Sequence, residues 1–255
     1  MLTKKFLQNL DENLKKTYCV TDIETTGQKP EESEIIEIAS IKVKDGKIID
    51  RFSSFVKPER SIPPFITKIT GIKNEDVAFA PVMDSVLKEW IDFIKGSDYF
   101  CAHNVMFDYE FIYRNLGICK IPRENLEQLK FFCTVKAGRI LFPNLPSRKL
   151  EDLITYFDIK VENRHRALDD ALATVQILST YFEELIKKKD ILIESIEKSQ
   201  NEKIKTFEAA EYLSVTKEKI YDMIKSRELK VAETYTTKNG YEGYLFYRRD
   251  VEKLV

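Results

Sequence analysis

The stretch that most constrains this chain is Tyr-Cys-Val-Thr-Asp-Ile-Glu-Thr-Thr-Gly, residues 18–27. Its aromatic and β-branched start predicts a short strand at residues 18–20, and the glycine at its end predicts a turn. Side chains alternate across a strand, so we expect Asp22 and Glu24 on one face. Two carboxylates held close together repel each other unless a proton or a cation lies between them. The stretch therefore fits either a site for a hard divalent cation or the solvated end of a strand.

The composition limits the class of protein. The chain has 255 residues, 43% of them hydrophobic, so it can bury a full core and form one large domain or two unequal domains. Lys and Arg number 41 and Asp and Glu 42, so the net charge of −1 gives no overall attraction to nucleic acid. The four cysteines are widely spaced without a C-x-x-C pair, which indicates reduced thiols and argues against a zinc site. Without a long apolar run, we expect no signal peptide, no membrane span and a cytoplasmic location.

The order of the predicted elements indicates an α/β fold. Alternation at residues 37–44, an Asp-Gly turn and a strand pattern at residues 47–56 predict that three antiparallel strands open the chain. Helical spacing then alternates with a short apolar strand at residues 99–102. Strands followed by alternating helices and strands indicate a mixed sheet covered by helices. The main predicted helices are residues 82–94, 106–116, 134–142, 149–157 and 167–187.

Two further acidic residues lie near predicted helix starts. Asp108 follows the strand at residues 99–102, and Asp170 opens the long helix. At about 100° per residue, Asp170 flanks the buried stripe of that helix, whereas Asp169 points to water. An aspartate near a helix start is also a favourable partner of the helix dipole, which is sufficient to explain Asp169. Asp170 is therefore the better candidate for a site.

Three motifs resemble, in the correct order, those of the DEDDh superfamily of 3′–5′ exonucleases, the group of the bacterial DNA polymerase III proofreading subunit. The resemblance covers about residues 16–185, and three ordered motifs are far more specific than any one of them. It implies a ribonuclease H-like fold. The motifs are Asp22-x-Glu24-Thr25-Thr26-Gly27, His103-Asn104-x-x-Phe107-Asp108 and His165-x-Ala167-x-x-Asp170.

The resemblance implies a role for each acidic motif residue. Two Mg²⁺ or Mn²⁺ ions per active site are expected, because these hard ions prefer oxygen ligands and leave positions for water and phosphate. Asp22, Glu24 and Asp170 would hold the first ion. Asp22 would also reach the second ion, which Asp108 would support.

The resemblance also implies a general base and contacts to the substrate. His165 would take a proton from the attacking water, although without the motif it would be interpreted as a surface-loop residue. His103 is expected to be structural. Phe107 fits either a base-stacking residue or a core residue. The substrate-binding residues implied are Thr25, Thr26, Asn104 and Phe107.

A change in composition near residue 203 predicts a second domain. We predict an exonuclease domain at residues 1–188, a helical linker at 189–202 and a small domain at 203–255. Two short helices, with Thr206 and Thr216 as N-caps, and a hairpin resemble the excisionase-type winged helix-turn-helix family. Its 11 basic and 9 acidic residues give a net charge of +2, so a protein-interaction or structural module remains the alternative. The resemblance implies DNA contacts from Lys217, Lys219, Tyr221 and Lys238.

The sequence therefore predicts a metal-dependent 3′–5′ exonuclease that hydrolyses nucleic acid, with DNA preferred, to nucleoside 5′-monophosphates in proofreading or repair. The expected partners are a single-stranded 3′ end, duplex DNA through the C-terminal domain, and a DNA polymerase. One alternative is an exoribonuclease that trims RNA, since the motifs do not read the 2′-hydroxyl. The other is a non-catalytic DNA-binding scaffold, against which the complete set of motif residues argues.

Overall fold

The computed structural model of the chain describes residues 2–161, 165–237 and 240–255. The structure divides into two compact units. The larger unit is Leu14–Glu184, and the smaller unit comprises Met1–Asn13 together with Leu185–Val255. The domain boundaries predicted at residues 188 and 203 stay predictions. None of the helices in the described part of the chain is long and apolar enough to cross a membrane.

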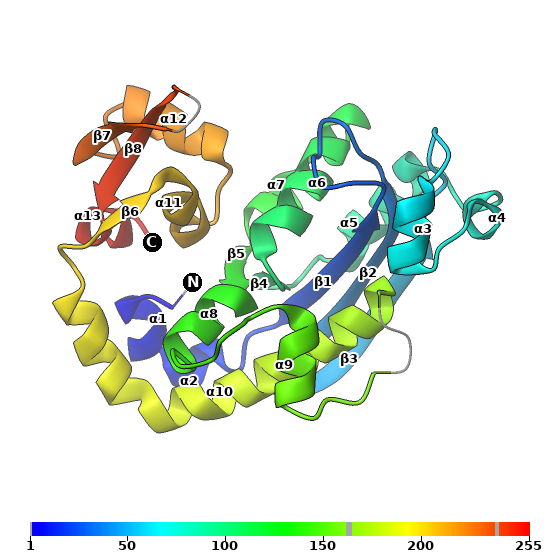
Figure 1. The fold of residues 1–255 in the computed structure, drawn as a ribbon. Helices are drawn as coiled ribbons and strands as arrows, with labels where there is room; N and C mark the ends of the chain where they lie inside the picture. The colour runs from blue at the N-terminus through cyan, green and yellow to red at the C-terminus, as the bar shows by residue number, and fades with distance from the viewer. Residues whose placement is uncertain (1, 162–164, 238–239) are drawn as a thin grey trace. The chain divides into compact units, whose positions relative to one another are not determined.

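The larger unit is built on a five-stranded mixed sheet of order β3-β2-β1-β4-β5 (Figure 1). The central strand β1, Tyr18–Thr25, is antiparallel to β2, Ile35–Lys44, and parallel to β4, Tyr99–Ala102. The outer strands are β3, Lys47–Phe55, antiparallel to β2, and β5, Lys130–Cys133, parallel to β4. The mixed α/β sheet expected from the sequence is thus confirmed.

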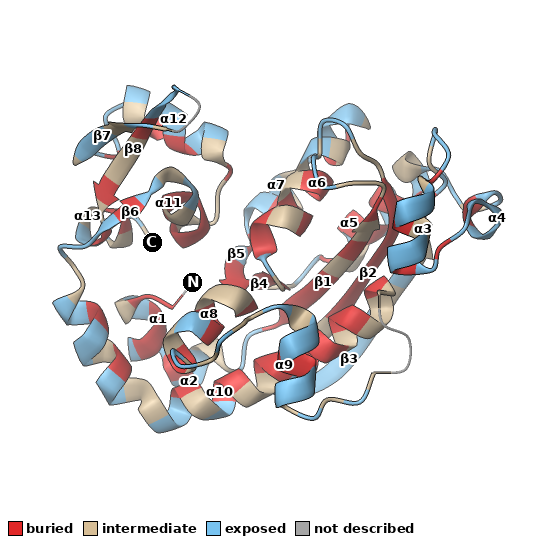
Figure 2. Cartoon of the chain, in the orientation of Figure 1, coloured by how far each residue is buried: buried red, intermediate tan, exposed pale blue. Residues whose placement is uncertain are grey.

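Burial along β1 follows from its central place in the sheet. Every residue of β1 is buried except Asp22 and Glu24, which are half-buried near its C-terminal end. The edge strand β3 is instead exposed over most of its length (Figure 2). The two acids therefore lie where the central strand emerges from the core.

Aromatic packing sets the layers on the two faces of the sheet. On one face, Phe182 of helix α10, Ala167–Lys198, packs against Tyr18 and Phe132 at 5.0 and 5.8 Å between ring centroids. On the other face, Trp90 of α5, Met83–Phe93, contacts Phe100, and Tyr109 of α6, Val105–Ile118, contacts Phe131. Tyr18, Asp22 and Glu24 share one parity in β1, so both acids project toward the α10 face.

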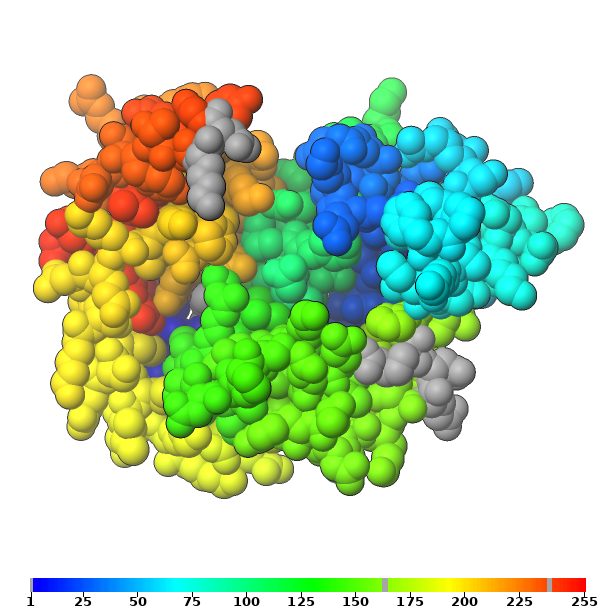
Figure 3. Space-filling view, viewed as in Figure 1, coloured from blue at the N-terminus to red at the C-terminus, as the bar shows by residue number. Residues whose placement is uncertain are grey.

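The remaining helices of the larger unit cover the sheet and its edges, and α8 and α9 form part of its outer surface (Figure 3). Helix α10 is continuous where the sequence predicted a helix and then a helical linker. The bounds are α3 Pro64–Thr70, α4 Asn74–Val77, α5 Met83–Phe93, α6 Val105–Ile118, α7 Glu124–Glu127, α8 Thr134–Leu141 and α9 Leu150–Tyr156.

Helix α6 continues through Gly117, where the sequence predicted its end. A side chain at Gly117 would collide with the guanidinium of Arg123, so this glycine admits a close neighbour and does not terminate the helix. The left-handed residue that follows the helix is Lys120, with φ 54°.

The smaller unit contains a three-stranded antiparallel sheet of order β6-β8-β7. Helix α12, Lys217–Lys225, is followed by a turn in which the Leu229 N–H donates to the Met223 carbonyl, and strand β7 begins at Glu233. The elements are α1 Lys4–Gln8, α2 Leu10–Asn13, β6 Lys203–Lys205, α11 Thr206–Leu213, α12 Lys217–Lys225, β7 Glu233–Thr236, β8 Glu242–Tyr247 and α13 Arg248–Glu252.

The N-terminal segment, which no sequence signal placed, packs within the smaller unit. Lys5 Nζ donates to the backbone carbonyl of Val255 at 2.8 Å, and Lys4 pairs with Glu197 at 2.7 Å. Leu7 is fully buried, as are its apolar neighbours in α1 and α2. The first and last residues of the chain therefore stabilise the same unit.

We expect Leu7→Ala to destabilise the smaller unit by about 2–5 kcal/mol, because it removes a fully buried side chain. Hydrogen exchange should accelerate in α13 and β8 and stay unchanged in α5. The matched variant Leu87→Ala, at a fully buried position of α5, should show the reverse pattern. Faster exchange in α5 upon Leu7→Ala would show that the segment supports the other unit.

Candidate active site

Three of the predicted acidic residues meet at the C-terminal end of β1. Asp22 and Glu24 come from alternate positions of the strand, and Asp170 comes from the first turn of α10. One carboxylate oxygen from each lies within 4.8 Å of the other two. Asp170 is buried, as its predicted position beside the packed stripe requires. A single cation could contact all three oxygens.

Asp108 approaches the same place from the first turn of α6. Its buried carboxylate accepts a hydrogen bond from the backbone N–H of Ile23, the residue between Asp22 and Glu24. Among the charges that act on Asp22, that of Asp108 has the largest effect. The fourth acid therefore lies close to Asp22.

Burial and mutual repulsion alter the proton affinity of these acids. Burial, and then the charges of Asp108, Glu24 and Asp170, raise the pKa of Asp22 well above its usual value. Burial, and then Asp170 and Glu37, raise the pKa of Glu24 to about 8, while Arg166 lowers it. These carboxylates bind protons strongly because burial and the neighbouring negative charges disfavour their ionised forms. A divalent cation would neutralise the same charges and replace the protons.

The two histidines have different surroundings. His103 Nδ1 lies 2.8 Å from Thr134 Oγ1, its Nε2 lies 2.9 Å from the Arg148 carbonyl, and burial lowers its pKa to about 4. Both ring nitrogens therefore serve the fold. His165 is half-buried, has φ 60°, and lies directly before the segment that opens α10. Its role as general base stays a prediction.

The predicted substrate-binding residues are close to the acids in sequence. They differ in burial and in the contacts that their side chains make within the chain. Thr25 Oγ1 donates to the Gly27 carbonyl at 2.6 Å, and Thr26 Oγ1 accepts from the Glu34 N–H at 2.9 Å. Both hydroxyls thus order the loop after β1. Asn104 is exposed and left-handed, with φ 73°, at the start of α6. Phe107 is half-buried with its ring 5.0 Å from that of Phe111, so it is only partly available for stacking.

Three of the residues predicted to touch DNA lie on α12 of the smaller unit. Lys219 and Tyr221 are exposed and Lys217 is half-buried, while Lys238 lies outside the described residues. Thr216 caps α12, since its hydroxyl accepts from the Lys219 N–H. The other predicted N-cap, Thr206, is wrong: Lys205 occupies the cap position, and its N–H is bound by the Glu208 side chain. The Glu208 carboxylate, which accepts this N–H at 3.0 Å, therefore replaces the hydroxyl cap.

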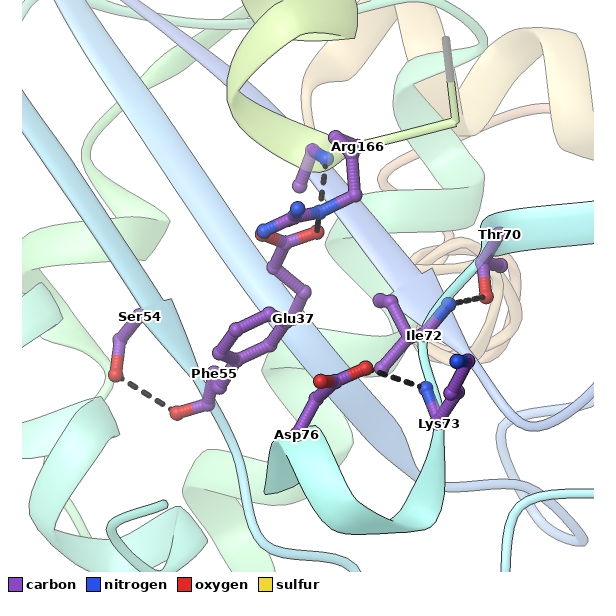
Figure 4. A network of polar contacts seen from close by, with 9 residues as sticks. Glu37, Ser54, Phe55, Thr70, Ile72, Lys73, Asp76 and Arg166 are labelled. Atoms are coloured by element: carbon purple, nitrogen blue, oxygen red, sulfur yellow. Dashed lines mark hydrogen bonds and ion pairs between the residues drawn. The ribbon is translucent and has the colours of Figure 1, made fainter. Parts of the chain in front are cut away.

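A buried ion pair beside the acids was not predicted from the sequence. Glu37 of β2 lies opposite Glu24 in the strand pairing and binds the side chain of Arg166 (Figure 4). Its side chain lies on the same face of β2 as the apolar side chains of Ala39, Ile41 and Val43. The available signal was the location of one acid among the apolar residues of a strand next to the strand that carries the motif.

Comparisons with known proteins agree with this arrangement. Residues 19–178 match the family described as exonuclease, a range that contains all three motifs. The DNA polymerase III PolC-type of Clostridium perfringens (strain 13 / Type A) is 39% identical over 181 residues, which are 71% of this chain and 12% of that protein. The 3′-5′ exonuclease DinG of Bacillus subtilis (strain 168) is 35% identical over 172 residues, 67% of this chain and 18% of that one. The chain thus spans less than a fifth of either relative.

A solved structure is similar over the same region. Exonuclease X in complex with 5′ overhanging duplex DNA has 28% sequence identity and a TM-score of 0.52, and the match covers 65% of this chain and 91% of that chain. The exonuclease fold expected for the larger unit is thereby confirmed.

We expect the thermal stability of the metal-free chain, measured in EDTA, to fall by several degrees between pH 5 and pH 8. The folded pKa of Glu24, about 8, lies above its ordinary value of 4.5, so its neutral form is favoured in the folded chain. The stability that this group contributes is fully present below pH 4.5 and is lost as the pH rises through 8. Asp22 and Asp108, whose pKa values are also raised, act in the same direction.

The increase in melting temperature caused by Mn²⁺ should grow over the same pH range, because the ion competes with protons for these oxygens. Glu24→Gln should reduce both pH dependences, whereas Glu32→Gln, at an exposed carboxylate paired with Lys29, should leave them unchanged. An Mn²⁺ effect that is independent of pH would contradict the assignment of these acids as ligands.

Proposed function

Because this chain belongs to the exonuclease family, we propose that it is a 3′–5′ exonuclease that releases nucleoside 5′-monophosphates from single-stranded DNA with Mg²⁺ or Mn²⁺. The observation that carries this proposal is the meeting of Asp22, Glu24 and Asp170, whose carboxylate oxygens lie within 4.8 Å of one another. DNA is favoured because the matched relatives are a DNA polymerase and a 3′-5′ exonuclease. The proposed setting is proofreading beside a DNA polymerase, or repair.

Each residue of the site has a proposed task. Two divalent ions, when bound, would supply the positive charge that phosphodiester hydrolysis requires. Asp22, Glu24 and Asp170 would hold one ion, and Asp22 and Asp108 the other. The hydrogen bond from the Ile23 N–H fixes the direction of the Asp108 carboxylate.

The remaining proposed tasks concern the proton and the substrate. His165 would accept a proton from the attacking water, for which an imidazole is suited. Thr25 and Thr26, whose hydroxyls already order the loop after β1, would present that loop to the terminal nucleotide. Asn104 would contact the nucleotide, and the exposed part of Phe107 would pack against its base.

We further propose that residues 203–255 form a winged helix-turn-helix module, joined by a helical linker at 189–202 to an exonuclease domain at 1–188. Helices α11 and α12 meet at a tight turn in which Ser214 has φ 58°, and the hairpin β7–β8 follows. Lys217, Lys219 and Tyr221 on α12, with Lys238 in the hairpin, would contact duplex DNA. The proposed location is cytoplasmic, which the free state of all four cysteines suits.

Single-stranded DNA labelled at its 5′ end should be shortened stepwise to mononucleotides in the presence of Mn²⁺ and stay intact in EDTA. Asp22→Asn should lower the rate by roughly 100-fold or more, because it removes a charge on which the reaction depends. Asp169→Asn, at the neighbouring acid outside the cluster, is the matched control and should retain activity.

An RNA of the same sequence tests the substrate class. Shortening of RNA but not DNA would replace the proposal with an exoribonuclease. Activity in neither polymer, or equal activity of Asp22→Asn and the wild type, would favour the non-catalytic scaffold.

Binding of the full chain to duplex DNA, measured in the Asp22→Asn background to prevent degradation, should weaken as salt increases. In the Lys217→Ala, Lys219→Ala double variant, the slope of the logarithm of the binding constant against the logarithm of the salt concentration should become about 1–2 less steep, since each lost phosphate contact removes about 0.9. Lys230→Ala, an exposed lysine of the same unit outside α12, should have no such effect. An unchanged affinity in the double variant would favour a protein-interaction module.

A further inference from the structure

Three side chains form a row across the sheet beneath the start of α10. Glu24 of β1 lies opposite Glu37 of β2, and Glu37 lies opposite Phe55 of β3. All three therefore project from the face of the sheet that α10 covers. One end of this row belongs to the acid cluster. The rest has no part in the proposed chemistry.

The middle member of the row binds the segment that opens α10 (Figure 4). Glu37 Oε1 accepts from Arg166 Nη2 at 2.8 Å and from Nε at 3.2 Å, and Oε2 lies 3.1 Å from the same Nε. The guanidinium carbon of Arg166 lies 4.9 Å from the centre of the Phe55 ring. The planar group is thus fixed by two oxygens at its edge and one ring at its face.

The same carboxylate also holds the backbone of the helix. Glu37 Oε2 accepts from the N–H of Ala167, the first residue of α10, at 3.0 Å. The first N–H groups of a helix have no carbonyl partner within the helix, and a negative charge there is favourable. A residue of the sheet therefore acts as the N-terminal cap of α10. The next contact in the chain is the first helical hydrogen bond, from the Asp170 N–H to the Arg166 carbonyl at 3.0 Å.

Stability alone does not account for this pair. Glu37 is 1% exposed, and burying a carboxylate is costly even when an arginine compensates it; apolar residues of similar size often stabilise a fold as well. The negative charge also lies next to acids that already repel one another, and it contributes to the raised pKa of Glu24. An apolar pair would not orient the helix. The hydrogen bonds from the Arg166 guanidinium and from the Ala167 N–H to Glu37 set both the position and the rotation of the start of α10.

We propose that Glu37 and Arg166 are positioning residues, which fix the start of α10 so that Asp170 and His165 face Asp22 and Glu24. Asp170 follows Arg166 by one helical turn, and His165 directly precedes it. A small displacement of this segment would move a metal-binding acid and the proposed general base together. This inference rests on the proposed function, and it concerns two residues outside the set proposed to hold the ions and the substrate.

The test uses the full-length chain with Arg166→Lys and, separately, Glu37→Gln. Arg166→Lys keeps the charge and loses the fork, so we expect kcat on single-stranded DNA to fall about 10- to 100-fold with KM nearly unchanged. The Mn²⁺ dissociation constant, measured by calorimetry without substrate, should rise about 10-fold. Glu37→Gln can still accept the Ala167 N–H, so its loss should be smaller than that of Glu37→Ala.

Arg248→Lys is the matched control for Arg166→Lys. Arg248 also binds a carboxylate, that of Glu252, and its guanidinium carbon lies 5.3 Å from the centre of the Tyr212 ring, but these contacts belong to the smaller unit. Both lysine variants should lower the melting temperature, and only Arg166→Lys should lose Mn²⁺ affinity and kcat. A purely structural role would lower the melting temperature and leave both quantities unchanged per folded molecule, which would overturn the proposal. Equal losses in Arg248→Lys would overturn it too.

The two proposals fail separately. If the wild type binds Mn²⁺ but shortens no nucleic acid, the proposed function is wrong, and the Mn²⁺ affinity of Arg166→Lys still decides the positioning role. If the wild type binds no Mn²⁺, both proposals are wrong.

Discussion

Acidic side chains that are close together and poorly solvated repel one another, and this repulsion is the constraint on which the rest of the larger unit depends. A chain keeps four such acids in one place only when each is mounted on an element that cannot move away. Asp170 is held through α10, whose Phe182 packs against Tyr18 and Phe132. Asp108 is held from the opposite side through α6, whose Tyr109 packs against Phe131. The aromatic layers on the two faces of the sheet thus provide the rigidity that a strained polar site requires.

Much of the site could be predicted because its residues obey local periodicities. The alternation of a strand places Asp22 and Glu24 on one face, and the phase of a helix separates Asp170 from Asp169. Both rules depend only on the geometry of one element, and the structure obeys both. The order of strands and helices likewise sufficed for the class of fold, because a mixed sheet follows from which strands are consecutive.

The features that could not be predicted depend on contacts between distant parts of the chain. Glu37 lies on the face of β2 that carries Ala39, Ile41 and Val43, and only the arrival of Arg166 from far along the sequence explains the burial of this acid. The guanidinium of Arg123 packs against Gly117, and α6 continues through this glycine, so its presence did not mark a helix end. The first residues carry too short a pattern to assign, and their place in the smaller unit is set by partners such as Glu197 and Val255.

The row formed by Glu24, Glu37 and Phe55 has a consequence for how the sheet assembles. Side chains in a strand alternate with a period of two, so a slip of β2 by one residue would turn Glu37 toward the face covered by α5. There it would meet the surroundings of Trp90, whose ring N–H is bound by Ser40, and a carboxylate without a cation is costly in such a place. The cost of burying an unpaired carboxylate therefore disfavours the slipped register of β2. The contact between Glu37 and Arg166 thus also helps to specify which residues of β1, β2 and β3 become neighbours.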